Sequence, residues 1–512
     1  MTQRIDTRPG MDFTALPGLE ALEAVSVSAR SLHDSLTEPV PDAVGYAVFA
    51  DQDPTPELGL TREALRRSGF DGKAGSTLVL PAADGPDRVA VGLGDRAKLT
   101  VNAVRDAAAA MARSASRRSR IALVIPDHGD LPDSEVARAA SEGALLARYR
   151  YTPLKSKPAD EPLTAVTIQL AGGDAPAVTE AIDASAVAAR ASIIARDLAN
   201  TPPGHLTATD MGRIAQTLGE RFGFDVTLFD KSALTDLGCG GLLGVNQGSA
   251  EEPRMIRLSY DPAGAAARHL GLIGKGIMYD SGGISLKPSD PMHLLMKMDM
   301  GGAAAVLGAF TGFRDTGVQA RVTGWLMCTD NMPSGSSYKL GDVLTTHGGT
   351  TIEVKNTDAE GRLVMSDAFD LANEAGVDAI IDIATLTGAA LMALGQAMAP
   401  VFSNDDALVD AVIAASAESD EPLWRMPLEQ KYRKQLDSDI ADIANLGGPY
   451  AGAITAALFL EHFASGTPWA HVDIAGTMQS DTDDAWRPKG ATGFGARTLL
   501  AAAARYGKSS AK

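Results

Sequence analysis

Cysteine is nearly absent from this chain of 512 residues, which contains only Cys239 and Cys328. Two distant cysteines can build neither a disulfide framework nor a thiolate zinc site. No stretch reaches the roughly 18 uninterrupted apolar residues that a membrane helix requires, and the first residues contain no apolar signal core. We therefore expect a cytoplasmic protein that does not interact with membranes.

Positive charge is also scarce, because 46 Lys and Arg residues stand against 64 Asp and Glu residues, for a formal net charge of -18. This balance argues against a surface that binds duplex DNA. The densest basic run, Arg117-Arg118-Ser119-Arg120, is typical of a solvated helix end. The other proportions, 45% hydrophobic and 21% charged residues, are those of an ordinary globular protein.

The length of the chain predicts two domains as the default and leaves room for three. Short apolar runs alternate with alanine-rich helical patterns over residues 1–175, which predicts an N-terminal α/β domain. A long connecting helix, ending before Pro202, would open a larger second domain over 176–512. Strands alternate with helices there as well, which predicts an α/β fold with a mostly parallel mixed sheet. The expected strands lie near 44–50, 76–81, 88–94, 121–126, 165–171, 224–229, 254–260, 270–274, 322–327 and 379–384.

The octapeptide NTDAEGRL at residues 356–363 concentrates charged side chains between a strand pattern and a helix pattern. Asp358 and Glu360 are two apart in a turn, so both can point to the same side. Arg362 falls in the first turn of the expected helix, where unpaired N–H groups favour an anion. The octapeptide alone is compatible with either a metal site or a phosphate site.

Two further stretches of the second domain also place charged residues directly after apolar runs. Together with the octapeptide they offer four carboxylates and three basic groups: Asp280, Asp299, Asp358, Glu360, Lys275, Lys287 and Arg362. Four carboxylates in one cleft repel one another unless cations or protons intervene. Two divalent metal ions would remove the repulsion and would activate a hydrolytic water. The eight histidines contain no pair at metal-ligand spacing, so we expect an oxygen-rich site for Mg, Mn or Zn.

Each motif also has a simpler interpretation. Gly-rich sequence around Lys275 could form a phosphate cradle, although it lacks the spacer and the Lys-Ser/Thr ending of a P-loop. Asp280 could be a turn aspartate, and Asp299 could cap the helix that follows it. The metal hypothesis depends on all three stretches occurring at strand ends of one domain. A two-metal phosphoesterase is a further alternative.

The charged stretches resemble the leucyl aminopeptidase family, whose members are hexameric two-metal exopeptidases. The resemblance covers about residues 195–500 and is most specific at the octapeptide. It is also carried by residues 196–203, 243–249, 275–287, 331–335, 339–343, 384–389, 451–457, 469–476 and 490–495. The first domain is similar to the family's macro-like α/β module in general layout only. One departure is an additional residue near 289–291, between Lys287 and Asp299, which we expect to bulge in a loop.

The resemblance implies two divalent metal ions per subunit, Mn or Zn, with Mg or Co as possible substitutes. The tighter ion would be held by Lys275, Asp280, Asp299 and Glu360. The exchangeable ion would be held by Asp280, Glu360 and the side chain and carbonyl of Asp358. A lysine ligand must be neutral, and two adjacent dications supply the field that lowers its pKa.

The resemblance also implies roles for the remaining residues. Lys287 would polarise the scissile carbonyl, and Arg362 would hold a bicarbonate ion that acts as general base. The pocket for the first side chain of the substrate would be formed by Met296, Thr385, Leu386 and Gly388. Such a pocket favours apolar residues such as leucine.

The implied protein is a cytoplasmic, homohexameric, metal-dependent aminopeptidase that releases N-terminal residues from peptides. The alternative from another functional class is an architectural DNA-binding protein built on an aminopeptidase scaffold. The net charge of -18 argues against that alternative.

Overall fold

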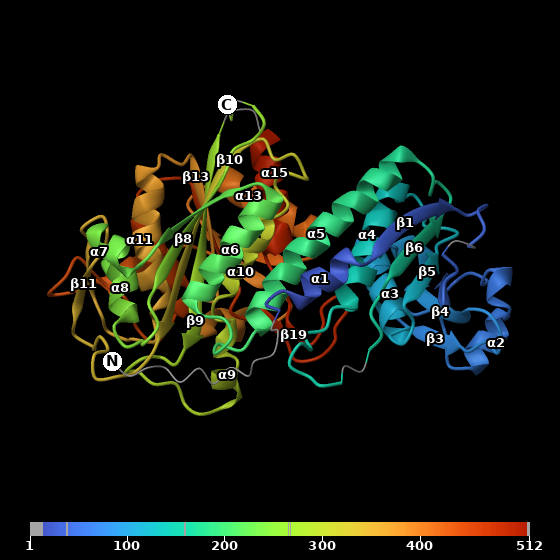
Figure 1. Ribbon diagram of the computed structural model, residues 1–512, viewed down its shortest axis with the longest axis horizontal. Coiled ribbons are helices and arrows are strands. Elements are labelled where there is room, and N and C mark those ends of the chain that lie inside the picture. The colour runs from blue at the N-terminus through green and yellow to red at the C-terminus, as the bar shows by residue number, and fades with distance from the viewer. Residues whose placement is uncertain (1–13, 37–38, 158–159, 265, 267, 509–512) are drawn as a thin grey trace. The chain divides into compact units, whose positions relative to one another are not determined.

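The computed structural model describes residues 14–36, 39–157, 160–264, 266 and 268–508. The chain forms two compact units (Figure 1). The N-terminal unit contains Gly18–Ile193 together with Ser480–Thr492, and the larger unit is built mainly from Ile194–Gln479 and the residues after Gly493. Within the described residues, no helix has both the length and the apolar character needed to cross a membrane.

The N-terminal unit is built on a six-stranded sheet in the order β1-β6-β5-β2-β4-β3. Its strands are β1 (Ser26–Ser31), β2 (Ala43–Phe49), β3 (Thr77–Leu80), β4 (Asp87–Gly94), β5 (Arg120–Val124) and β6 (Ala165–Leu170). All neighbours are parallel except β3, which runs antiparallel to β4. Five of these strands were predicted from the apolar runs. β1 was not, because its sequence SVSARS has little apolar character and its position depends on pairing with the distant β6.

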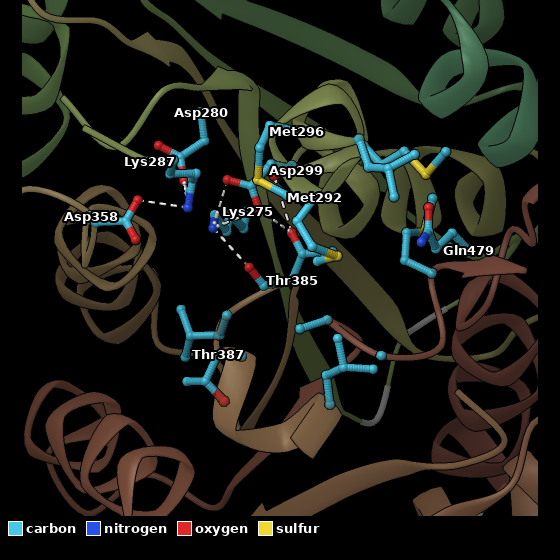
Figure 2. A pocket seen from close by; sticks show the side chains of 18 of the residues that line it. Lys275, Asp280, Lys287, Met292, Met296, Asp299, Asp358, Thr385, Thr387 and Gln479 are labelled. Atoms are coloured by element: carbon cyan, nitrogen blue, oxygen red, sulfur yellow. Dashed lines mark hydrogen bonds and ion pairs between the residues drawn. The ribbon is translucent and has the colours of Figure 1, made fainter. Parts of the chain in front are cut away.

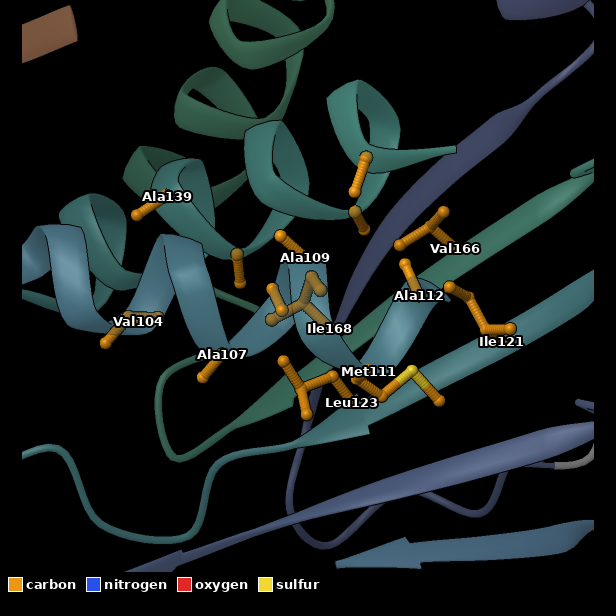
Figure 3. Close-up of a cluster of buried hydrophobic side chains, with 14 of the residues drawn as sticks. Val104, Ala107, Ala109, Met111, Ala112, Ile121, Leu123, Ala139, Val166 and Ile168 are labelled. Atoms are coloured by element: carbon orange, nitrogen blue, oxygen red, sulfur yellow. The ribbon is translucent and has the colours of Figure 1, made fainter. Parts of the chain in front are cut away.

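Alanine-rich helices cover this sheet. The helices of the unit are α1 (Pro17–Glu23), α2 (Arg62–Arg67), α3 (Val101–Ser114), α4 (Asp133–Ala147) and α5 (Pro176–Asn200), the last of which continues into the larger unit. Figure 3 shows Ala107 and Met111 of α3 close to Leu123 of β5 and Ile168 of β6. Small side chains let α3 and α4 pack closely, and burial of their apolar faces drives the association.

A segment from far along the sequence completes the N-terminal unit. Residues Ser480–Thr492 include β19 (Gly490–Ala491), and Trp486 is fully buried in the same apolar cluster as α3 and α4. Arg113 donates a hydrogen bond to the carbonyl of Arg487 at 2.9 Å, and Arg150 forms an ion pair with Asp483 at 2.8 Å. The core of this unit therefore depends on two segments that lie almost 300 residues apart in sequence.

The larger unit contains an eight-stranded mixed sheet in the order β15-β14-β17-β13-β9-β10-β8-β7. The strands are β7 (Asp225–Phe229), β8 (Arg254–Tyr260), β9 (His269–Asp280), β10 (Arg321–Asn331), β13 (Ala379–Ala384), β14 (Ala399–Ser403), β15 (Leu423–Arg425) and β17 (Trp469–Asp473). The central strands β17, β13, β9 and β10 are parallel. β13 and β17 are buried along their whole length, as expected for parallel strands covered on both faces. The prediction of a mostly parallel mixed sheet is confirmed.

Helices lie on both faces of the large sheet (Figure 1). Helices α7 (Lys231–Asp236), α8 (Gly240–Asn246) and α11 (Gly361–Glu374) lie on one side, and α6 (Ala208–Phe222), α10 (Gly301–Phe310), α13 (Asp406–Ser419) and α15 (Ala496–Lys508) on the other. Helix α14 (Gly452–Ala464) packs against α11. A small sheet contains β11 (Val343–Thr345) and β12 (Thr351–Glu353), which precede α11, and β16 (Ile443–Ala444), which follows α11 in sequence. The octapeptide connects β12 to α11, so the predicted strand-to-helix turn is confirmed.

Candidate functional site

The charged residues predicted from the sequence converge at one edge of the large sheet. Lys275 lies inside β9 and Asp280 at the end of β9, while Asp358 and Glu360 immediately precede α11. Asp299 follows a short 3-10 turn at Met296–Met298. Figure 2 shows Lys275 and Lys287 among the carboxylates of Asp280, Asp299 and Asp358. Glu360 lines the same pocket.

Lys275 is almost fully buried and is surrounded by acceptors. Its Nζ lies 2.8 Å from Asp299 Oδ2 and 2.8 Å from Glu360 Oε1, and it donates to the carbonyl of Thr385 at 2.7 Å. Burial by itself would lower the pKa of Lys275, but the charges of Asp299 and Glu360 outweigh burial and raise it. The phosphate-cradle interpretation is wrong, because Lys275 lies inside a strand among carboxylates rather than in an open loop.

Lys287 pairs with the other two carboxylates. Its Nζ lies 2.8 Å from Asp280 Oδ2 and 2.6 Å from Asp358 Oδ1 (Figure 2). Burial again opposes the charge, while Asp280 and the neighbouring acids raise the pKa of Lys287. The neighbouring carboxylates therefore favour the protonated form of Lys287.

The carboxylates form a group that suits a divalent cation. Ligand oxygens of Asp280, Asp358 and Glu360 all lie within 4.8 Å of one another. Oxygen Oε2 of Glu360 is buried and has no hydrogen-bond partner. Burial, followed by repulsion from Asp280, raises the pKa of Glu360 to about 8, and burial raises that of Asp299 to about 6. A divalent cation would satisfy the unpartnered oxygen and would remove the repulsion.

The contacts of Asp280 and Asp299 show how far the turn and helix-cap interpretations of these two aspartates hold. Asp280 Oδ1 does accept a hydrogen bond from Gly282 N at 2.8 Å, as a turn aspartate does, but its other oxygen faces Lys287. Asp299 does not cap α10: the N-cap residue is Met300, and no side chain caps that end. Instead, Asp299 Oδ1 accepts from Thr385 Oγ1 at 2.7 Å.

The turn after Asp280 lets Asp358 approach closely. Gly282 has a φ of 86°, and a Cβ at this position would lie 2.8 Å from Asp358 Oδ1. The sequence predicts that the additional residue near 289–291 bulges in a loop, and residues 286–290 do lie in a loop that ends where the next helix begins. Asp290 caps the short helix α9 (Pro291–Leu294) by accepting from His293 N at 3.0 Å, and Asp299 still reaches Lys275 beyond it.

Two asparagines that sequence reasoning missed hold the site together. Asn331, at the end of β10, donates to Asp280 Oδ1 at 2.8 Å and to the carbonyl of Thr357 at 2.9 Å. Asn445, next to β16, donates to the carbonyls of Asn356 and Ala359. Asn331 lies in a stretch that carried the resemblance, whereas an isolated asparagine such as Asn445 has no local signal.

Arg362 occupies the first turn of α11, as predicted, and is buried. Its guanidinium donates to the carbonyl of Asn445 at 2.9 Å, whereas Nε has no hydrogen-bond partner. Burial lowers the pKa of Arg362 to about 10, so the side chain remains charged at neutral pH. Arg362 is not among the residues that line the pocket.

The pocket beside the charged group has a volume of about 250 Å³. All four residues predicted to form it, Met296, Thr385, Leu386 and Gly388, do line it. Further apolar side chains were not predicted: Met292, Leu295, Met298, Leu391 and Met478. The charged group lies at one end of the pocket, and Gln479 lies well away from it in the view of Figure 2. The pocket can therefore hold an apolar side chain next to the charged group.

Comparisons with known proteins agree with this geometry. The model of the cytosol aminopeptidase family, catalytic domain, matches residues 193–500, and the model of that family's N-terminal domain matches residues 54–158. A probable cytosol aminopeptidase of Roseiflexus castenholzii is 42% identical over 451 residues, covering 86% of this chain and 92% of the relative.

Two solved structures are similar over almost the whole chain. The bottromycin maturation enzyme BotP in complex with Mn has 38% identity and a TM-score of 0.84, over 91% of this chain and 100% of BotP. A tomato leucine aminopeptidase mutant has 30% identity and a TM-score of 0.85, over 94% of this chain and 97% of its own. The chain therefore belongs to the cytosol aminopeptidase family and is a metal-dependent aminopeptidase.

Proposed function

We propose that this aminopeptidase uses two divalent cations held by the residues that meet at the sheet edge. One cation would be bound by Lys275, Asp280, Asp299 and Glu360, and the other by Asp280, Asp358 and Glu360. The observation that carries the proposal is the buried Glu360, whose Oε1 faces Lys275 while its Oε2 has no hydrogen-bond partner. Mn is the first candidate, since the similar BotP structure contains it, and Zn, Mg and Co are alternatives.

When bound, the cations would supply a Lewis acid that activates the attacking water. Lys287 lies beside Asp280 and Asp358, and in its protonated form it would stabilise the oxyanion that develops on the scissile carbonyl. Lys275 would have to give up a proton before its amine could act as a ligand.

Arg362 would hold a bicarbonate ion that acts as general base. Its buried, charged guanidinium has an unpartnered Nε and lies at the N-terminus of α11, where free N–H groups also favour an anion. Arg362 follows Glu360 by two residues, so one short segment carries both a proposed cation ligand and the proposed anion partner.

The substrates would be peptides with an apolar first residue such as leucine. Thioether and methyl groups of Met296, Leu386 and Leu391 line the pocket, and methionine surfaces adapt to apolar side chains of different shape. The leucine aminopeptidase from tomato is a structural relative with that specificity in its name.

The active form would be a cytoplasmic homohexamer. The larger unit exposes several large apolar side chains, among them Leu294 at 77%, Met392 at 87% and Tyr450 at 81%. Association with further copies of the chain would remove such side chains from water.

Metal removal tests the proposed reaction. We expect hydrolysis of leucine p-nitroanilide to fall to background after treatment with a chelator and dialysis, and to return when Mn²⁺, Zn²⁺, Co²⁺ or Mg²⁺ is added back. Glu360→Gln should reduce turnover by about 10³-fold or more, because it removes a charge shared by both cation sites. Full activity of the metal-stripped protein, or near-normal turnover of Glu360→Gln, would contradict the two-metal proposal.

A further inference from the structure

Asp473, at the end of β17, has no role in the chemistry described above, yet its carboxylate is saturated with hydrogen bonds. It is 1% exposed. Oδ1 accepts from the backbone N–H groups of Leu386 at 3.0 Å, Thr387 at 3.3 Å and Ala475 at 3.2 Å. Oδ2 accepts from the hydroxyl of Thr387 at 2.7 Å. One carboxylate therefore joins the turn after β13 to the turn after β17.

These two turns are the walls of the substrate pocket. The turn after β13 contributes Thr385 to Gly388, and the turn after β17 contributes Ala475, Gly476 and, a little further on, Met478. The strands are in register at Ala384 and Asp473, and Ile474 N donates to the carbonyl of Ala384 at 2.8 Å. Asp473 itself does not line the pocket, so it can act only through the turns that it holds.

The same carboxylate fixes the helix that follows the first turn. Thr387 Oγ1 donates to Asp473 and accepts from Ala390 N at 3.0 Å, which makes Thr387 the N-cap of α12 (Gly388–Leu394). Helix α12 places Leu391 in the pocket wall. Movement of the Thr387 hydroxyl would therefore shift Leu391 as well as Leu386.

We infer that Asp473 is a positioning residue that sets the width of the pocket for the first side chain of the substrate, and thereby the preference for leucine over smaller residues. The inference rests on the proposed assignment of this pocket. Discrimination between apolar side chains depends on close packing, and one methylene group contributes about 10- to 200-fold. A buried acceptor bound by four donors is costly to displace, so it can keep both walls at a fixed separation.

The test is the ratio of kcat/KM for leucine and alanine p-nitroanilides in Asp473→Ala, Asp473→Asn and Thr387→Val. Asp473→Ala removes all four hydrogen bonds, and we expect it to reduce the leucine preference by about tenfold, mainly through a higher KM for the leucine substrate. Asp473→Asn keeps an acceptor for the N–H groups but loses the acceptor for the hydroxyl. Thr387→Val loses the same link together with the N-cap of α12, so both variants should give intermediate ratios.

Glu421→Gln is the matched control. Glu421 is also a buried carboxylate that accepts from backbone N–H groups, those of Gly495 at 3.1 Å and Thr498 at 3.0 Å, but it does not line the pocket. Its leucine-to-alanine ratio should equal that of the wild type. Melting temperature and Mn²⁺ binding by calorimetry would show that each variant is folded and loads metal.

An Asp473→Ala protein that is folded and keeps the wild-type ratio within about twofold would overturn the inference. If Asp473→Ala does not fold, unchanged ratios in both Asp473→Asn and Thr387→Val would overturn it equally. A wild-type protein that hydrolyses neither substrate would overturn the proposed function and this inference together. An active wild type with unchanged ratios in the variants would overturn the inference alone.

Discussion

Lys275 and Lys287 have the same chemical group and different environments, and this difference separates their proposed roles. Lys275 is 3% exposed and touches Asp299 and Glu360. Lys287 is 20% exposed and touches Asp280 and Asp358. A metal ligand must be a neutral amine, whereas stabilisation of an oxyanion requires a cation. The enclosed lysine suits the first role and the partly solvated lysine suits the second.

At this scale we predict that metal binding releases protons. Burial and the neighbouring carboxylates raise the pKa of Glu360, and the acids around Lys275 raise the pKa of its amine. Because a cation needs the carboxylate and the free amine, loading should release about one to two protons per subunit near pH 7. Protons compete with the metal, so the apparent Mn²⁺ affinity should rise with pH and the contribution of Glu360 should end above about pH 8. Calorimetry in buffers of different ionisation enthalpy measures the number.

Lys275→Met provides the comparison for that experiment. It removes one of the two titrating groups and should release about one proton fewer while binding Mn²⁺ more weakly. A wild-type affinity that is independent of pH between 6 and 8 would show that neither group changes protonation, and the assignment of Lys275 as a ligand would then be wrong.

The octapeptide is an element whose shape depends on its neighbours. Asn445 Oδ1 accepts from Lys355 N at 2.8 Å and Asn356 N at 3.3 Å, while Nδ2 donates to the carbonyl of Asn356 at 2.7 Å and that of Ala359 at 3.3 Å. Asn445 is fully buried. One side chain therefore replaces the backbone partners that this loop lacks.

Asn445→Ala should disturb this element in two ways. It leaves buried backbone groups without partners, which should lower the free energy of unfolding by about 2 kcal/mol or more. Because Asp358 and Glu360 lie in the loop that it holds, Mn²⁺ affinity should fall by about tenfold or more. Denaturant titration and calorimetry measure the two effects.

Asn404→Ala is a suitable control for Asn445→Ala. Asn404 also exchanges hydrogen bonds with backbone groups, donating to the carbonyl of Thr467 at 3.0 Å and accepting from Trp469 N at 2.8 Å, but it does not line the pocket. Asn404→Ala should lower the free energy of unfolding without weakening Mn²⁺ binding. Equal Mn²⁺ affinity in Asn445→Ala and the wild type would mean that the octapeptide keeps its shape unaided.

Elements with a strong local pattern could be predicted from the sequence, and elements that depend on distant partners could not. The apolar run at residues 379–384 predicted β13, and the helical periodicity after residue 361 predicted α11. Burial imposes such a pattern locally, so both were visible in the sequence. β9 continues to Asp280, beyond the expected end at 274, because the sheet pairs its glycine-containing second half with β10. Asn331, Asn445 and Asp473 escaped prediction because a single polar residue has no period.

At the scale of the whole molecule, Trp486 holds the late segment Ser480–Thr492 in the core of the N-terminal unit. Trp486→Ala would leave a large cavity among α3, α4 and their neighbours, and should lower the free energy of unfolding of this unit by about 3–5 kcal/mol. Denaturant unfolding followed by circular dichroism measures the loss. Trp424→Ala, at a tryptophan that is 59% exposed, should change stability by about 0.5 kcal/mol or less.

An equally small loss of unfolding free energy in both tryptophan variants would show that the N-terminal core does not need residues 480–492. The alternation of strands and helices predicted two α/β layers correctly. It could not predict that this segment returns to the N-terminal unit. The sequence DTDDAWRP contains no regular apolar pattern, and a single tryptophan does not indicate which core it packs into.

The late return of the chain also delays completion of the N-terminal core during biosynthesis. The first 193 residues leave the ribosome long before Trp486 does, and at about 5–20 residues per second the delay is roughly 15 to 60 seconds. During that interval the nascent N-terminal unit exposes the apolar surface that Trp486 later covers. A chaperone that recognises exposed apolar surface would have that long to bind it, and translation speed would decide how long the half-built core stays open to aggregation.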